Sequence, residues 1–277
     1  MTWIEMTTCK DPGPSRKKKF MNDCTHIDDA PRAVLPVVLV CDVSASMAGA
    51  PIATLHAEIE ALICGLSQHP VAASVTRLSV VTFADSARVH VPMSEVPQMG
   101  TIAAFEAGGA TSYEVVFDLL ARALPVELKS LAAQGHAVYR PTVFFFSDGT
   151  PTDDPTSWRA ARDRLTTNAA GPNIVSFGIG DVDAPTIRDV AYGRGAAFLA
   201  HDDNDVASAL AYAIDAILHA TLDSFAIAPE LSDPMPTLRP PIPREVPGFV
   251  PLDVVYASAE ALQVSRQGTH SRRRLRP

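Results

Sequence analysis

Residues 37–41, Val-Val-Leu-Val-Cys, form an uninterrupted apolar run of strand length that stops abruptly at Asp42. The run is rich in β-branched residues and does not alternate with polar ones, which is typical of a strand covered on both faces in a parallel sheet. Two hydroxyls follow in the spacing Asp42-x-Ser44-x-Ser46. In open α/β sheets the carboxyl ends of the strands border the crevice that binds ligands. This stretch therefore constrains both the fold class and the position of a site.

Strands and helices are expected to alternate along the rest of the chain. Clusters of β-forming apolar residues predict further strands at residues 77–83, 88–92, 142–149, 173–180 and 196–199. Apolar stripes predict helices after Pro51, after Ser112, around Trp158, over 184–191 and over 205–222. Residues 88–92 alternate and end in Pro92, as an antiparallel edge strand does. The pattern predicts an α/β fold with a doubly wound, mostly parallel six-stranded sheet, one antiparallel edge strand and helices on both faces.

The two ends of the chain lack this regularity. Residues 1–33 show no sustained periodicity and are expected to be a flexible extension, whose true start is either Met1 or Met21. Residues 34–223 carry the alternating pattern and form the predicted domain. Residues 224–277 are a Pro- and Arg-rich tail, with eight prolines between 229 and 251, and we expect it to be partly disordered. Apolar residues remain in the tail, which leaves open whether part of it docks.

Composition narrows the class of protein. Hydrophobic residues make up 47% of the 277 residues, enough for a sizeable core, and no apolar stretch approaches the ~20 residues that span a membrane. The four cysteines lie far apart, which favours a cytoplasmic protein without disulfides or structural zinc, with Cys41 and Cys64 as buried thiols. The whole acidic excess lies in residues 34–223, which would repel nucleic acid. A nucleic-acid adaptor that uses the basic tails remains a minor alternative.

Oxygen-bearing side chains stand at three separate places along the chain. Asp42, Ser44 and Ser46 follow the first strand, Thr111 follows a Gly-Gly-Ala turn, and Asp148 ends a second strand that is apolar throughout. In a doubly wound sheet these three loops converge at the point where the strand order reverses. Carboxylate and hydroxyl oxygens suit a hard divalent cation.

This constellation, in this order, resembles the von Willebrand factor A domain, a Rossmann-like fold, with its metal-ion-dependent adhesion site (MIDAS). Residues 79–92, 108–111 and 147–153 are similar to the bacterial TerY type, which is associated with tellurium-resistance gene clusters. The resemblance covers residues 35–222. It implies that Ser44, Ser46 and Thr111 contact the metal, while Asp42 and Asp148 hold metal-bound waters and orient the serines. Mg²⁺ is the implied occupant, with Mn²⁺ as an alternative.

The sequence departs from the family in two places. Ala45 stands where the family usually has Gly, which questions the geometry of that loop but not the ligands. The zinc-binding C-terminal extension of some relatives has no cysteine pairs to build it here.

The function implied by the resemblance is a non-enzymatic, Mg²⁺-dependent protein-interaction module. A partner protein would supply an Asp or Glu carboxylate to the metal, and a phosphatase, kinase or ATPase is the implied kind of partner. The setting would be an intracellular bacterial stress-response, tellurium-resistance-like or signalling assembly, with neither nucleic acid nor membrane as a partner.

The alternative function is a metal-dependent phosphohydrolase with Asp42 as nucleophile and Asp148 on the metal. Haloacid-dehalogenase-type enzymes need a second acid two residues after the nucleophile, and Ser44 occupies that position. The sequence also offers no suitable lysine for such an enzyme, because the only lysine of the predicted domain is Lys129.

Each candidate residue also has a purely structural interpretation. Ser44 or Ser46 would cap the next helix, Thr111 or Ser112 would cap the helix that follows it, and Asp148 would serve a turn. Asp153 and Asp154 are expected at a helix start rather than on a metal.

Overall fold

The computed structural model describes residues 32–167, 171–201, 204–226 and 240–252. All of these residues belong to one compact unit. The predicted extension at 1–33 lies outside the described residues except for its last two positions, and so does most of the predicted tail.

The described residues form one mixed, eight-stranded sheet with the order β3-β2-β1-β5-β6-β7-β8, and β4 pairs with β1 beside this path. β2, β1, β5, β6 and β7 run parallel, whereas β3 is antiparallel to β2 and β8 is antiparallel to β7. The strands are β1 Ala33–Asp42, β2 Thr76–Phe83, β3 Ala87–Glu95, β4 Ala137–Val138, β5 Thr142–Gly149, β6 Asn173–Asp181, β7 Ala197–Ala200 and β8 Phe249–Leu252. The predicted fold class and all six predicted strands are confirmed, but the sheet has eight strands rather than six and two antiparallel edge strands, β3 and β8, rather than one.

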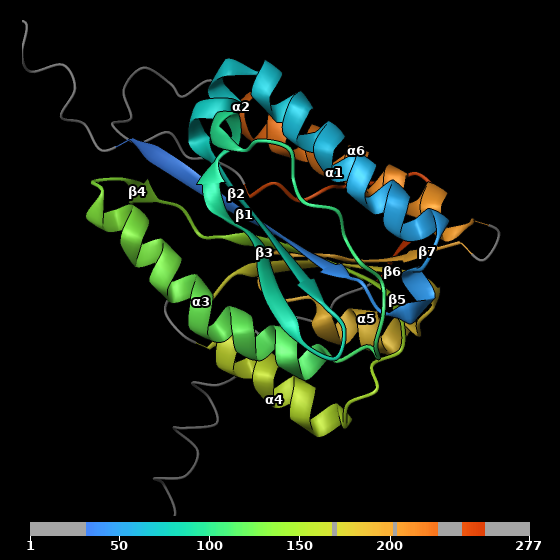
Figure 1. The fold of residues 1–277 in the computed structure, drawn as a ribbon. Helices are drawn as coiled ribbons and strands as arrows, with labels where there is room; N and C mark the ends of the chain where they lie inside the picture. Colours follow the sequence, from blue (N-terminus) through green and yellow to red (C-terminus); the bar gives the residue numbers. More distant parts are fainter. Residues whose placement is uncertain (1–31, 168–170, 202–203, 227–239, 253–277) are drawn as a thin grey trace, which may run out of the picture. The chain divides into compact units, whose positions relative to one another are not determined.

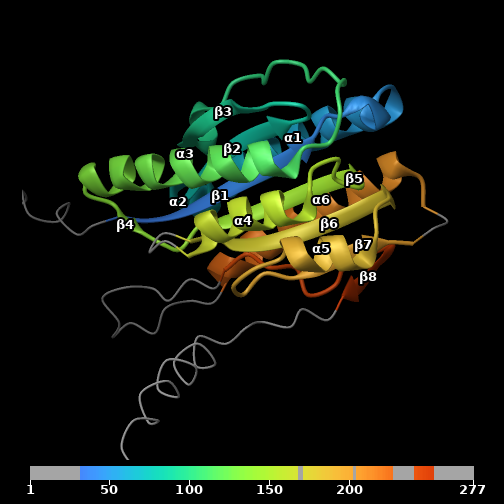
Figure 2. The ribbon, with the colours of Figure 1, turned by 90° about the horizontal axis from the view of Figure 1, so that it is seen from below.

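Helices cover both faces of the sheet (Figure 1, Figure 2). On one face lie α1 Ala50–Gln68, α2 Pro70–Val75 and α6 Val206–Ala226. On the other lie α3 Tyr113–Ala133, α4 Pro155–Thr166 and α5 Ala184–Val190. The short 3-10 helices η1 Ala45–Met47 and η2 Val96–Gln98 follow β1 and β3. The arrangement is the doubly wound one in which both faces of the central strands are buried.

The central strands supply apolar side chains to two cores at once. Along β1, Leu39 and Cys41 belong to the core under α1 and α6, while Val38 and Val40 belong to the core under α3 and α4. On that second side the Phe145 ring stacks on Phe83 and Phe117, with centroids 5.3 Å and 5.6 Å away. Since successive side chains of a strand point to opposite faces, a strand buried on both sides needs apolar residues at every position. This requirement explains the uninterrupted runs before Asp42 and before Ser147.

Two further statements made from the sequence need correction. Cys64 is exposed, because it lies on α1 away from the buried stripe of Leu55, Ile59 and Leu62. Val206–Phe225 is, by length and composition alone, apolar enough to cross a membrane. In the structure this segment is α6, which packs against α1 and buries a stripe along the core. The stripe consists of Ala209, Leu210, Ala213, Ile214 and Ile217.

Part of the predicted tail packs on the domain. Residues 249–252 form β8 on the edge of β7, and the Gly248 carbonyl accepts hydrogen bonds from His201 N–H and Asn204 Nδ2. The Phe249 ring is buried and meets Phe177 edge-on at 5.8 Å. A predicted domain that ends at 223 leaves this strand out, because prolines obscure the strand pattern in the sequence.

We expect Phe249→Ala to lower the free energy of unfolding by about 3 kcal/mol, because the ring is almost fully buried against the core. Val250→Ala is the matched control on the same strand, since Val250 is 45% exposed, and it should cost well under 1 kcal/mol. Urea unfolding of the full chain measures both values. Equal, small effects of the two substitutions would show that β8 is not part of the folded domain.

Candidate metal site

The candidate residues lie where β1 and β5 end side by side. The chain leaves β1 through α1 on one face of the sheet and reaches β5 after α3 on the other face, so the strand order reverses between these two strands. Cys41 is paired with Phe146, which makes Asp42 and Ser147 neighbours on the same face. Parallel strands end at one edge of a sheet, so the loops after β1 and β5 meet there.

The Asp42 carboxylate is held by donors on both of its oxygens. Its Oδ1 accepts the backbone N–H of Ser44 at 2.8 Å, and its Oδ2 accepts the Ser147 hydroxyl at 2.7 Å. The residue is only 1% exposed. Asp42 is therefore fixed in one orientation beneath the loop that carries the two serines.

The serine hydroxyls connect this loop to Asp148. Ser44 Oγ and Ser46 Oγ lie 3.0 Å apart, and the Ser46 hydroxyl donates to Asp148 Oδ1 at 2.8 Å. Ser44 is buried whereas Ser46 is exposed, so the row of oxygens runs from the protein interior to the surface. The structure thus brings Asp42, Ser44, Ser46 and Asp148 into one hydrogen-bonded group that is open to solvent.

Thr111 reaches the same place through backbone contacts of its loop. Gly108 N–H donates to the Val43 carbonyl at 2.8 Å, and Ala45 N–H donates to the Gly109 carbonyl at 3.0 Å. Gly109 has a φ of +82°, a conformation that favours glycine. Thr111 Oγ1 lies 3.5 Å from the point that a Cβ on Gly149 would occupy, so it sits beside the residue after Asp148. Among the described residues this hydroxyl has no hydrogen-bond partner, although Thr111 is only 6% exposed.

The candidate hydroxyls do not act as caps of the neighbouring long helices. Gly49 is the N-cap of α1, and the N-cap Ser44 of η1 makes no side-chain cap bond. Ser112, not Thr111, caps α3 by accepting from the N–H of Val115. Asp154 caps α4, as predicted, and Asp153 accepts the N–H of Glu114 at the start of α3. The capping interpretation of Ser44, Ser46 and Thr111 is therefore not supported.

The two carboxylates lack a compensating positive charge. Burial raises the pKa of Asp42 to about 6, and the nearby Asp148 adds to the increase, while hydrogen bonds from Ser44 and Ser147 oppose it. Burial also raises the pKa of Asp148. Within the described residues neither carboxylate forms an ion pair with Lys, Arg or His. Two acids and three hydroxyls without a counter-charge are a donor set that fits a hard divalent cation.

Other observations bear on this fit. Ala45 lies in η1, a right-handed conformation that alanine adopts easily, so its difference from the family pattern does not strain the loop. Across the described ranges there is no cluster of three or more His, Cys, Asp or Glu side chains that would hold a metal. A metal at this site would consequently depend on the hydroxyls.

Two residues of the site were not identified from the sequence. Ser147 binds Asp42, and Asp85 Oδ1 accepts the Ala110 N–H at 2.8 Å, which holds the loop of Thr111. Ser147 stands directly before Asp148, and knowledge of the register between β1 and β5 would have placed it next to Asp42.

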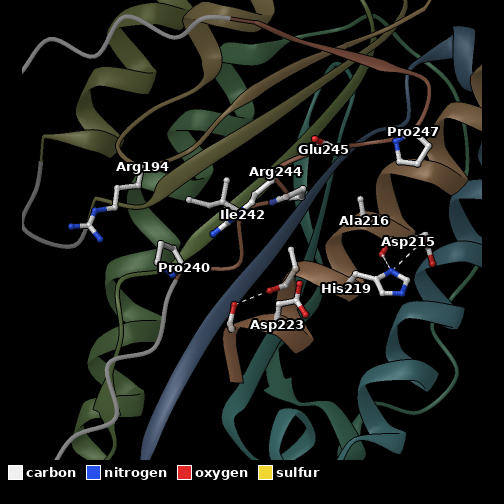
Figure 3. Close-up of a pocket in the computed structure, with 13 residues that line it drawn as sticks. Arg194, Asp215, Ala216, His219, Asp223, Pro240, Ile242, Arg244, Glu245 and Pro247 are labelled. Atoms are coloured by element: carbon white, nitrogen blue, oxygen red, sulfur yellow. Dashed lines mark hydrogen bonds and ion pairs between the residues drawn. The ribbon is translucent and has the colours of Figure 1, made fainter. Parts of the chain in front are cut away.

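A cavity of the described residues lies away from this site (Figure 3). It has a volume of about 920 Å³ and lies between α6 and the extended residues 240–247. Its lining mixes charges of both signs, with Arg194 and Arg244 on one hand and Asp215 and Asp223 on the other. None of the candidate metal-site residues lines it.

Comparison with solved structures supports the fold. A von Willebrand factor type A protein from Catenulispora acidiphila matches with a TM-score of 0.51 at 15% identity, over 69% of this chain and 43% of that one. The pilus adhesin SpaC from Lactobacillus rhamnosus GG matches with 0.54 at 11% identity, over 70% and 30%. A D319A mutant of the PilB minor pilin from Streptococcus sanguinis matches with 0.52 at 12% identity, over 72% and 64%. The chain thus spans less than half of the first two proteins.

One family model matches part of the sequence. A search of curated proteins found no match. Residues 37–151 match the family model of the von Willebrand factor type A domain, a stretch that includes the last six residues of β1, all of β5 and every candidate site residue. Residues 37–151 are thus similar to the von Willebrand factor type A domain, and the described residues share the fold of the solved structures above.

Proposed function

We propose that the chain is a protein-interaction module whose binding surface is centred on a divalent cation, Mg²⁺ or Mn²⁺. Domains of this family typically act as interaction modules rather than enzymes. The observation that supports the cation is the row of oxygens from buried Asp42 through Ser44 and Ser46 to Asp148, with no cationic side chain paired to either acid among the described residues.

Each candidate residue would have its own role at the cation. The hydroxyls of Ser44, Ser46 and Thr111 would contact the ion, while Asp42 and Asp148 would orient the serines and balance the charge from behind. Neutral ligands leave a bound cation most of its charge, so it would attract an anionic group from outside. The chemistry of the partner follows: a protein that presents an Asp or Glu carboxylate at its surface.

The loops around the site would supply most of the contact area with a partner protein, because one carboxylate on the cation is too small an interface. Ser112 N–H donates to the Ala84 carbonyl at 3.1 Å, and Thr152 N–H donates to the Thr111 carbonyl at 2.8 Å. These bonds hold the loops 84–87, 108–112 and 149–154 together around the candidate metal. A partner that reaches the ion would also meet these loops.

The finer assignments rest on the sequence motifs alone. We propose a TerY-like adaptor in the cytoplasm that works in a stress-response or tellurium-resistance-like assembly, with a phosphatase, kinase or ATPase as the partner. Residues 79–92, 108–111 and 147–153 are the motifs that support this subtype.

The structure disfavours the phosphohydrolase alternative. A carboxylate nucleophile must reach its substrate, whereas Asp42 is 1% exposed and both of its oxygens accept hydrogen bonds. Lys129 lies sixteen residues along α3 from Tyr113, which puts it about 24 Å away at ~1.5 Å per helical residue. The Asp42 carboxylate is thus shielded from a substrate, and the lysine that such an enzyme would need lies far from it.

We expect calorimetry to show that the full chain binds Mg²⁺ and Mn²⁺ at one site. Thr111→Ala should weaken the binding at least tenfold, about 1.4 kcal/mol, because it removes a ligand, and Asp148→Ala should abolish it. Thr221→Ala is the matched control, since Thr221 is a buried threonine that donates to the Ile217 carbonyl on α6. Unchanged affinity in both Thr111→Ala and Asp148→Ala would refute the site.

Partner binding should require the ion. We expect a protein captured on the immobilised full chain in Mg²⁺ to be released by a chelator and recaptured when Mg²⁺ is restored. The double variant Ser44→Ala/Ser46→Ala should fold, by circular dichroism, but capture nothing. A native partner whose affinity is the same in chelator and in Mg²⁺ would contradict the metal-bridged mechanism while leaving the fold intact.

A further inference from the structure

We propose that Ser147 is a positioning residue of the metal site, which fixes Asp42 and thereby sets the affinity for the cation. The proposal rests on the proposed function, because it concerns the same cation. It adds a residue that none of the ligand roles above includes.

The contact between Ser147 and Asp42 is short and fully enclosed. The Ser147 hydroxyl donates to Asp42 Oδ2 at 2.7 Å, and both residues are 1% exposed. The other carboxylate oxygen already accepts the N–H of Ser44. Because both groups are buried, bulk water competes little with this bond, and the Ser147 hydroxyl is the donor that holds the second oxygen of Asp42.

Ser147 also connects Asp42 to the turn that carries Asp148. Its Oγ lies 3.1 Å from the Gly149 carbonyl and 3.4 Å from the Gly149 N–H. A hydroxyl has a single proton to donate, and the bond to a charged carboxylate is the shorter and the stronger of the two choices. The proton therefore goes to Asp42, and the oxygen accepts the Gly149 N–H. The Gly149 carbonyl still accepts a hydrogen bond from the Tyr113 hydroxyl at 3.3 Å.

Loss of this hydroxyl would release Asp42 without changing any ligand. Oδ2 would be left as a buried carboxylate oxygen without a donor, which is unfavourable and allows the carboxylate to turn. Ser44 depends on the orientation of Asp42, because its N–H is bound to Oδ1. The expected result is weaker cation binding from a residue that does not touch the cation.

The test compares two buried serines on adjacent strands. Ser147→Ala removes the donor to Asp42, while Ser176→Ala is the matched control, since Ser176 is also fully buried and donates at 2.7 Å to the Ile187 carbonyl, away from the site. Mg²⁺ and Mn²⁺ affinities of the full chain are measured by calorimetry, and unfolding in chelator is measured by circular dichroism. We expect comparable losses of stability, but a loss of cation affinity of about tenfold only in Ser147→Ala.

Two further variants separate the hydroxyl from its volume. Ser147→Cys keeps nearly the same side-chain size, but a thiol is a weak donor, so the variant should lower the cation affinity as Ser147→Ala does. It takes the place of Ser147→Ala in the test if that variant fails to fold. Ser147→Thr keeps the hydroxyl and should bind within a few-fold of the unaltered chain. If the unaltered chain binds the ions and Ser147→Ala and Ser147→Cys bind them as well as Ser176→Ala does, the positioning role is wrong and the metal site stands. If the unaltered chain binds neither ion, both proposals fall.

Discussion

The hydrogen bonds that hold the Asp42 carboxylate at the end of β1 are the interactions on which the rest of the candidate site depends. One comes from the backbone of the serine loop and the other from Ser147 on the neighbouring strand. Together they allow a carboxylate to remain buried beside a second one, Asp148, although no cation pairs with either in the described residues. Such a pair is electrostatically incomplete, and the proposed divalent cation would supply the missing charge.

The fold makes this arrangement possible because adjacent parallel strands deliver their last residues to one edge. β1 and β5 are buried on both faces, so, apart from Thr142 at the start of β5, their polar residues lie at their carboxyl ends. The loop of Thr111 is then tied to the same edge by backbone bonds to Val43, Ala45 and Ala84. Three of the five candidate residues carry uncharged hydroxyls, of which Ser46 is exposed, and a cation held by them would keep the charge that the proposed capture of an external carboxylate needs.

Much of the fold could be read from the sequence, because a doubly covered strand needs an unbroken apolar run and few other structures do. The strand β8 was not predicted, because prolines obscure its pattern in the sequence. The burial of Cys64 was predicted wrongly, because its apolar neighbours on α1 face a different side of the helix. The candidate residues Asp42 and Asp148 stand out in sequence because they end such runs. Ser147 did not, because its role depends on the register between β1 and β5, which only the structure gives.

The most direct test of the cation site is the anomalous scattering of Mn²⁺ in a crystal of the full chain. The account predicts one strong peak among the hydroxyls of Ser44, Ser46 and Thr111, in front of the Asp42 and Asp148 carboxylates. Saturating Mn²⁺ with no peak there, or with ordered Mn²⁺ only at another place such as the acidic side chains of α6, would contradict it.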